Sequence, residues 1–212
     1  VKAESGKGGL FSSSSKSTYT QDYRTSKSST VAAGGNLSLL AGVSGLTPGA
    51  SADTPASPGH ASVVGSNLVS GKDLTVAASG NVNVSSAQNS SYFSHTKSTV
   101  GALGLSSSSK REEKSSVTQV GSTLSGENVK ISAGNDITAT ASNIFAAQNV
   151  QLNAAKGNIL LDAAQNTQSS YYKSSSSRAG IFGGSSGISF ASSKQKQKGA
   201  GVGKNIGSAI MA

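Results

Sequence analysis

Residues 134–166 read "GNDITATASNIFAAQNVQLNAAKGNILLDAAQN" and repeat one short phrase three times. Each copy has a small turn residue and an Asn, followed by two apolar residues with one residue between them. The apolar pairs are Ile137/Ala139, Val150/Leu152 and Ile159/Leu161. Because successive side chains of a strand point to opposite faces, this alternation predicts short β-strands.

The same phrase occurs in three other stretches, "AGGNLSLLAG" (33–42), "GKDLTVAASGNVNVSSAQN" (71–89) and "GENVKISAGNDITAT" (126–140). Corresponding apolar positions lie 21 residues apart from Val129 to Val150 and 22 apart from Ile137 to Ile159. This period is too short for a propeller blade, which needs about 40 residues. It favours a parallel β-helix, in which each strand pairs with its equivalent one turn away. We therefore expect these two pairs of residues to lie over one another.

The composition explains why the apolar phrases are so small. The chain has 45 Ser and 26 Gly among 212 residues, and Val, Leu, Ile and Phe together number 41. The alternative that this composition leaves open is a disordered Ser/Gly linker. Stacked turns avoid that outcome, because each turn contributes a few inward side chains to a continuous core. Asn residues before the strands are expected to form hydrogen-bonded ladders; they are Asn81, Asn128, Asn135, Asn149 and Asn158.

Two kinds of segment do not fit the phrase. Residues 43–61 contain all three prolines (Pro48, Pro55, Pro58) and indicate a surface loop. Three other segments alternate Ser, Thr and Lys around a Gly-rich tip, which predicts β-hairpins at 8–30, 92–124 and 171–198. Because an isolated hairpin is marginally stable, these must pair with the stacked turns or with one another.

The expected division of the chain follows from these segments. A hairpin that completes a preceding repeat is expected at 1–30, β-helix turns at 31–91, a projecting hairpin at 92–124, further turns at 125–170, a hairpin at 171–198 and an unplaced tail at 199–212.

The residues offer no set of groups for catalysis. Zero cysteines exclude disulfides, Cys-bound metals and thiol nucleophiles. His60 and His95 lack a neighbouring carboxylate cluster, and the segment "GAGVGKN" (199–205) departs from phosphate-loop spacing. Glu112 and Glu113 lie within "KREEK", which is typical of a solvated cluster that neutralises itself. We therefore predict no enzyme activity, no cofactor and no metal.

The net charge of +9 suggests two interpretations of the lysines near the C-terminus. In a strand, "KQKQK" places Lys194, Lys196 and Lys198 on one face, where they could contact an anionic glycan or lipopolysaccharide. The other interpretation is a sheet edge on which lysines prevent aggregation. Nucleic acid is not expected, because no aromatic residues alternate with these lysines. Two aromatic pairs, Tyr92–Phe93 and Tyr171–Tyr172, are expected to cover the junctions between turns and hairpins rather than to bind sugar.

No run of 18 apolar residues is present, and neither an initiating Met nor a signal-peptide pattern stands at Val1. We therefore expect the chain to be a fragment of a longer protein.

The phrases at 71–89 and 126–140, together with "SSYYKSSSSRAGIFGGSSGISF" (169–190), resemble the haemagglutinin-repeat region of filamentous haemagglutinin-type exoproteins. The likeness covers residues 8–198 and is nearest to contact-dependent growth-inhibition effector proteins. It implies a right-handed β-helix in a filament on the surface of a Gram-negative bacterium, secreted through an outer-membrane two-partner transporter. It also implies a role in adhesion or toxin delivery at the surface or outer membrane of a target cell. The secretion domain and a toxin domain of that family are not recognisable in this sequence.

Overall fold

The computed structural model describes residues 2–6, 12–42, 58–181 and 188–212, and it confirms the all-β prediction. Pro48 and Pro55 of the expected loop lie outside the described residues. The chain forms two compact units, and the parallel unit comprises Thr25–Asn89, Thr118–Asn166 and Lys204–Ala212. The antiparallel unit comprises Val1–Arg24, Ser90–Val117 and Thr167–Gly203.

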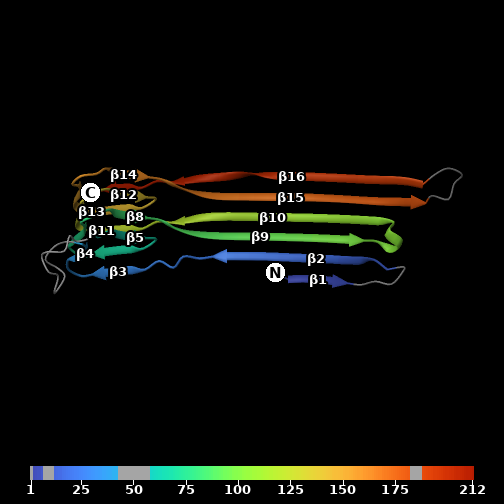
Figure 1. The fold of residues 1–212 in the computed structure, drawn as a ribbon, viewed down its shortest axis with the longest axis horizontal. Helices are drawn as coiled ribbons and strands as arrows, with labels where there is room; N and C mark the ends of the chain where they lie inside the picture. Colours follow the sequence, from blue (N-terminus) through green and yellow to red (C-terminus); the bar gives the residue numbers. More distant parts are fainter. Residues whose placement is uncertain (1, 7–11, 43–57, 182–187) are drawn as a thin grey trace. The chain divides into compact units, whose positions relative to one another are not determined.

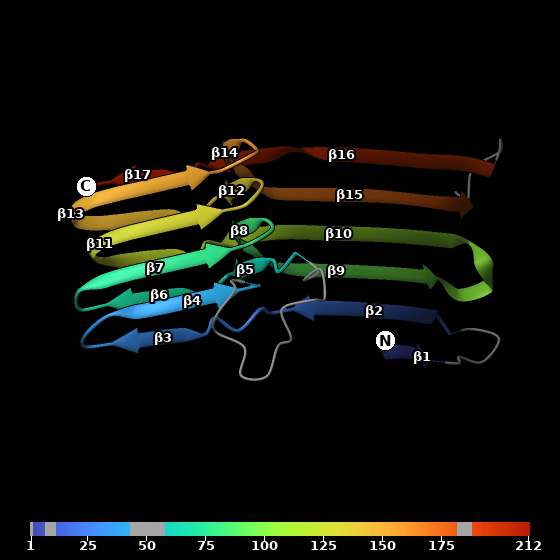
Figure 2. The same cartoon turned by 60° about the vertical axis from the view of Figure 1, so that its left-hand side comes forward.

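The parallel unit contains three sets of parallel strands, and the chain visits the sets in the same order on each circuit (Figures 1 and 2). The first set is β3 (Thr30–Ala33), β6 (Asn67–Ser70), the start of β11 (Thr123–Ala133), the start of β13 (Asn143–Ala154) and β17 (Ala209–Met211). The second set is β4 (Leu37–Ala41), β7 (Asp73–Ala78) and the later parts of β11 and β13. The third set is β5 (Ala61–Val64), β8 (Val82–Ser85), β12 (Ile137–Thr140) and β14 (Ile159–Asp162).

The registers confirm the predicted stacking of apolar pairs. Val129 lies opposite Val150, and Ile137 lies opposite Ile159. Equivalent residues meet in columns across the circuits, so that each short strand adds one layer to a continuous core. The columns are Leu37–Leu74–Val129–Val150, Leu39–Val76–Ile131–Leu152, Ala61–Val82–Ile137–Ile159, Val63–Val84–Ala139–Leu161 and Val31–Leu68–Leu124–Ile144–Ile210.

Burial is complete in the middle of these columns and falls off in their outer layers. Val76, Val84 and Ile131 are fully buried, whereas Ile159 is 45% and Leu161 47% exposed. The difference arises because β12 pairs with strands on both sides, whereas β14 pairs with β12 alone among the described strands.

A ladder of serines joins the circuits at one corner of the parallel unit. The backbone N–H of Ser66 donates to Ser122 Oγ at 3.1 Å, and that of Ser122 donates to Ser142 Oγ at 3.3 Å. In the same way, the Ser29 N–H donates to Ser66 Oγ, and the Ser142 N–H donates to Ser208 Oγ. Ser122 and Ser142 are buried, and their hydroxyls donate in turn to backbone carbonyls, so each buried group has a partner.

The serine ladder has a sequence signature that identifies the C-terminal strand. "GSNL" (65–68), "GSTL" (121–124), "ASNI" (141–144) and "GSAI" (207–210) each place a small residue and the ladder serine before a strand. The sequence interpretation left residues 199–212 unplaced, but β17 pairs in parallel with β13. The shared pattern of Gly or Ala, Ser, one residue and an aliphatic residue is the signal that could have located it.

The Asn ladder was predicted in part. Asn149 Nδ2 donates to Asn128 Oδ1 at 3.0 Å, which confirms that pair. At the corner before the third set of strands, Asp136 rather than Asn135 makes the side-chain contacts. The Asp136 N–H donates to Asn81 Oδ1, and the Asp136 carboxylate accepts from the Asn158 N–H at 2.8 Å. Asn135 instead donates its backbone N–H to the Gly80 carbonyl.

The antiparallel unit is a six-stranded sheet with the order β1-β2-β9-β10-β15-β16 (Figure 1). Its strands are β1 (Lys2–Gly6), β2 (Ser14–Arg24), β9 (Ala87–Val100), β10 (Ser106–Val120), β15 (Ala164–Ile181) and β16 (Ile188–Ile206), with a 3₁₀ turn (Ala102–Gly104) between β9 and β10. β2 pairs with β9 and β10 with β15, so of the two expected kinds of pairing the structure shows these segments pairing with one another.

We predict that Ser122→Ala lowers the free energy of unfolding by about 1–3 kcal/mol, because it leaves the Ser66 N–H and the Ser85 carbonyl without their buried partner. Urea denaturation followed by circular dichroism measures the change. Ser125→Ala is the control in the same strand, because the Ser125 side chain makes no hydrogen bond with a residue that the structure describes. Equal effects of the two substitutions would show that the ladder contributes nothing.

We predict that Gly65→Ala destabilises the chain by about 1–2 kcal/mol or more. Gly65 has φ +53°, and an added Cβ would lie 2.5 Å from the Ala87 Cβ. Gly35→Ala is the matched control, since no atom lies within 4 Å of the added Cβ and φ is not positive there. We expect that control to be neutral or slightly stabilising in the same denaturation experiment.

Candidate functional site

The two units differ completely in charge. The antiparallel unit contains 13 of the 18 Lys and Arg residues and four of the nine acids, so its net charge is +9. The parallel unit contains five residues of each sign and is neutral. A charge this concentrated attracts anionic partners, which makes the antiparallel unit the candidate site.

The strand registers separate the two faces of the antiparallel sheet. Partners in an antiparallel pair share a face, so Tyr23 lies beside Ser91 and Tyr19 beside His95. Ser91 hydrogen bonds to Ser116, so the two side chains lie on one face, and this face continues from β9 onto β10. We call it the aromatic face, defined by Tyr19, Tyr23, Phe93, His95, Glu112, Lys114, Gln168 and Tyr172.

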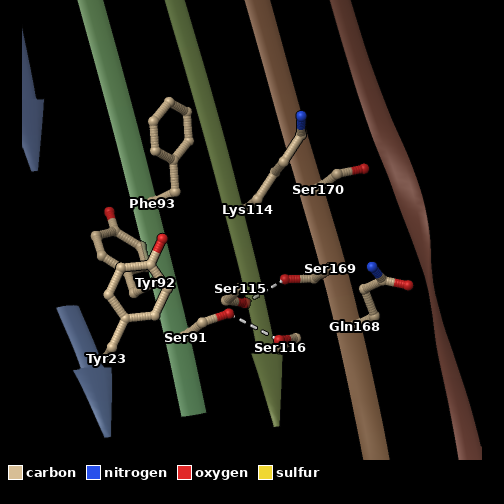
Figure 3. Close-up of a pocket in the computed structure, with 10 residues that line it drawn as sticks. All are labelled: Tyr23, Ser91, Tyr92, Phe93, Lys114, Ser115, Ser116, Gln168, Ser169 and Ser170. Carbon is tan, nitrogen blue, oxygen red and sulfur yellow. Dashed lines mark hydrogen bonds between the residues drawn. The ribbon is translucent and has the colours of Figure 1, made fainter. Parts of the chain in front are cut away.

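The aromatic face contains a hollow of about 510 Å³ (Figure 3). Tyr23, which is 65% exposed, stands on β2, while Phe93 comes from β9 and Lys114 from β10. The hollow mixes aromatic rings with hydroxyl, amide and ammonium groups. Its lining residues on this face are Tyr23, Ser91, Phe93, Lys114, Ser116, Gln168 and Ser170, and it is also bordered by Tyr92, Ser115 and Ser169, which the register assigns to the opposite face.

Further along the aromatic face, the rings of Tyr19 and His95 are stacked with centroids 4.2 Å apart. His95 Nε2 lies 3.1 Å from Ser17 Oγ, which orients the imidazole on the sheet. A hydrogen bond from Lys114, at 2.7 Å from Glu112 Oε1, lowers the pKa of the Glu112 carboxyl below its ordinary value.

The opposite face, which we call the arginine face, carries Tyr92, Arg111, Glu113, Tyr171 and Lys173. Two guanidinium nitrogens of Arg111 donate to Glu113 Oε1, at 3.0 and 2.6 Å, and this hydrogen bond raises the pKa of Arg111. Tyr92 donates to the same oxygen at 3.3 Å. Together with the Lys114–Glu112 pair, these contacts show that "KREEK" pairs its own charges, with exposed cations and partly buried carboxylates.

Serine hydroxyls also pair across neighbouring strands of this sheet. Ser107–Ser177, Ser109–Ser175 and Ser115–Ser169 are each 2.7 Å apart across β10 and β15. Ser176 and Ser193 pair across β15 and β16 at 2.8 Å. The described side chains form no buried apolar layer in this unit, so hydrogen bonds carry the pairing.

The structure places the predicted lysines on β16, the last strand of the sheet. Lys194 and Lys196 are exposed, and neither forms an ion pair with a described residue. The Ser176–Ser193 pair belongs to the aromatic face, so alternation puts Lys194 and Lys196 on the arginine face. Lys198 lies in the same strand, but its side chain is outside the described residues.

The remaining predicted residues do not assemble into a reactive centre. His60 lies in the parallel unit, where its Nδ1 accepts from the Asn81 N–H, and His95 lies in the antiparallel unit. Within the described ranges, no three His, Asp or Glu side chains lie close enough to hold a metal ion. Residues 199–205 lie within strand β16, which differs from the loop before a helix that binds phosphate.

The hollow brings a further aromatic residue, Tyr23, to one of the two aromatic pairs of the sequence. Tyr92, Phe93, Tyr171 and Tyr172 all belong to the antiparallel unit, and Tyr92 and Phe93 line its hollow with Tyr23. That Tyr23 joins them depends on the register between two different hairpins, for which the sequence carries no turn signal. Whether these rings cover a junction stays a prediction.

We predict that Lys114→Gln raises the pKa of Glu112 toward its ordinary value, because the hydrogen bond from Lys114 is the largest cause of the lowered pKa. Carboxyl NMR titration measures it, and Lys16→Gln on β2 is the control. Since the folded pKa is depressed, this contact stabilises the chain above the unfolded pKa of Glu112, and the stabilisation is lost as pH falls through the folded pKa. An unchanged titration in Lys114→Gln would contradict the assignment.

Within the described part of the chain, no helix is long and apolar enough to cross a membrane. A comparison with protein families finds the family described as Hemagglutinin repeat, which matches twice in tandem, at residues 10–106 and 103–210. No solved structure matches the chain.

Three curated proteins are similar to part of the chain. "16S rRNA endonuclease CdiA" of Enterobacter cloacae is 34% identical over 125 residues, which is 58% of this chain and 4% of that protein. "Deoxyribonuclease CdiA" of Yersinia pseudotuberculosis is 31% identical over 132 residues, covering 56% of this chain and 12% of that protein. "Toxin CdiA" of Yersinia pestis is 32% identical over 132 residues, or 56% of this chain and 4% of its own length. The matched region is thus a small part of each of these long relatives.

Proposed function

We propose a function from the premise that this chain belongs to the hemagglutinin-repeat family: it is a structural repeat segment of a secreted surface exoprotein that carries a toxin to neighbouring cells. Proteins of this kind are exported by two-partner secretion and displayed on the surface of Gram-negative bacteria. The observation that carries the proposal is the tandem family match on a chain whose strands stack in register from circuit to circuit.

The finer description of the fold is a right-handed parallel β-helix bearing hairpins. Support comes from the constant order of the three strand sets and from pairing between residues 21 and 22 positions apart where nothing is inserted. The pairing distance grows to 55 residues, from Leu74 to Val129, where the β9–β10 hairpin intervenes. We propose that the hairpins at 92–124 and 171–198 project from the helix and that 31–91 and 125–170 are its turns.

The segment itself is proposed to be non-catalytic and to serve delivery. The relatives' names assign nuclease or toxin activity to proteins of which this region is a small fraction. In the chain itself, the described His, Asp and Glu residues form no metal cluster, and the two glutamates of β10 pair with Arg111 and Lys114. An outer-membrane transporter and the surface of a target cell are the partners that this role requires.

Deleting residues 90–117 from the full-length exoprotein tests the delivery role. This removes the β9–β10 part of the antiparallel unit and joins two segments of the parallel unit. We expect attachment to target cells to persist and toxin entry to be lost, measured by co-sedimentation and by target-cell survival. Circular dichroism of the shortened segment checks that the parallel unit folds. Loss of both properties, or of neither, contradicts the proposal.

A further inference from the structure

The strand register explains the shape of the hollow on the aromatic face. Across β2, β9, β10 and β15, one row of side chains consists of Tyr23, Ser91, Ser116 and Gln168. Figure 3 shows the two serines between the Tyr23 ring on one side and Gln168 on the other. Neighbouring strands lie about 4.8 Å apart, so the row spans about 14 Å and has its short side chains in the middle. These serines form the floor of the hollow, on the two central strands of the sheet.

Two aromatic rings give the hollow an apolar side. Tyr23 is exposed on β2, and Phe93 is half-buried on β9, two residues along the strand from Ser91. The face of an aromatic ring is electronegative, so it attracts the weakly positive C–H groups that one side of a pyranose ring presents. The rings therefore offer a surface on which a sugar can pack.

The polar groups of the hollow both donate and accept hydrogen bonds, as sugar hydroxyls require. Gln168 and Ser170 are exposed, and their side chains make no hydrogen bond with a residue that the structure describes. Ser91 and Ser116 hydrogen bond to each other at 2.8 Å, and the hydroxyl that accepts in this pair keeps its own proton for a ligand. The amide of Gln168 supplies a donor and an acceptor in one group.

The charge within the hollow is already balanced. Among the described residues that line it, Lys114 alone is charged, and its ammonium lies 2.7 Å from Glu112 Oε1. An anionic ligand would have to compete with that carboxylate, whereas a neutral one would not. The volume of about 510 Å³ lies within the range of small-molecule sites. The lining thus favours a neutral ligand, although the unit as a whole is basic.

We propose that this hollow binds a neutral saccharide. One side of a pyranose ring packs on Tyr23 and Phe93, and its hydroxyls exchange hydrogen bonds with Gln168, Ser170 and the serine floor. The site differs in place and chemistry from the anionic-glycan site suggested by the lysines of β16, because Lys194 and Lys196 do not line the hollow. It goes beyond the proposed function, to which it adds a contact with neutral sugars.

The test mixes the 212-residue chain with the methyl pyranosides of glucose, galactose, mannose and N-acetylglucosamine, one at a time. Saturation-transfer-difference NMR detects binding, and we expect at least one glycoside to bind with saturation reaching its ring C–H protons. Tyr23→Ser should weaken that binding about tenfold, whereas Tyr23→Phe should preserve it, because the ring rather than the phenol hydroxyl makes the contact. Failure of all four glycosides to bind contradicts the proposal.

Filling the floor of the hollow is a second test, and it leaves both aromatic rings in place. Ser116→Phe should abolish binding, because the larger side chain occupies the space between Tyr23 and Gln168. Ser115→Phe is the matched control: Ser115 is the adjacent residue and also bonds to a serine of a neighbouring strand, but on the opposite face. We expect this control to bind like the unmodified chain, and circular dichroism checks that both variants fold.

Two outcomes would overturn the assignment even if a glycoside binds. Binding that survives Ser116→Phe would place the sugar elsewhere on the chain. Binding that is lost in Lys194→Gln/Lys196→Gln would assign it to the lysines of β16. These readouts do not involve toxin entry, so a failure of this site is distinguishable from a failure of the proposed function.

Discussion

The serine ladder is the contact on which the register of the parallel unit depends. Apolar columns alone set register weakly, because Val, Leu and Ile are nearly interchangeable between layers. A buried serine hydroxyl constrains the register more strongly, because in each circuit it must accept from one N–H and donate to one carbonyl. By joining Ser66, Ser122 and Ser142 across segments of very different length, the ladder defines where each circuit begins.

The two units are stabilised by different kinds of interaction. The parallel unit is neutral and buries a column of small aliphatic side chains, with Val76, Val84 and Ile131 fully enclosed. The antiparallel unit carries the whole net charge and is held by backbone pairing, serine hydroxyl pairs and the ion pairs of β10. A low content of apolar residues is thus compatible with an ordered chain, because only one unit needs a core.

Local patterns in the sequence predicted the strands of the parallel unit well. The alternation at Val129/Ile131 and the 21-residue period fix both the strand type and its partner, since the stacked circuits contact their nearest neighbours. Predictions failed where a partner lies far away in sequence. The strand at Ala209 and the pairing of Tyr23 with Ser91 join segments separated by 66 and 68 residues, and no turn specifies such a register. The side-chain ladder uses Asp136 where Asn135 was expected for a different reason, because a shift by one residue in a corner leaves the apolar pattern unchanged.

The spacing between ladder serines has a consequence for how such chains diversify. Adjacent circuits are separated by 20 residues from Ser122 to Ser142, but by 66 from Ser142 to Ser208, and the geometry at the corner is the same. Segments of 20 and of 66 residues can thus lie between two ladder serines while the same hydrogen bond joins the adjacent circuits. The length of chain between two circuits is therefore free to differ without a change in the contact that aligns them.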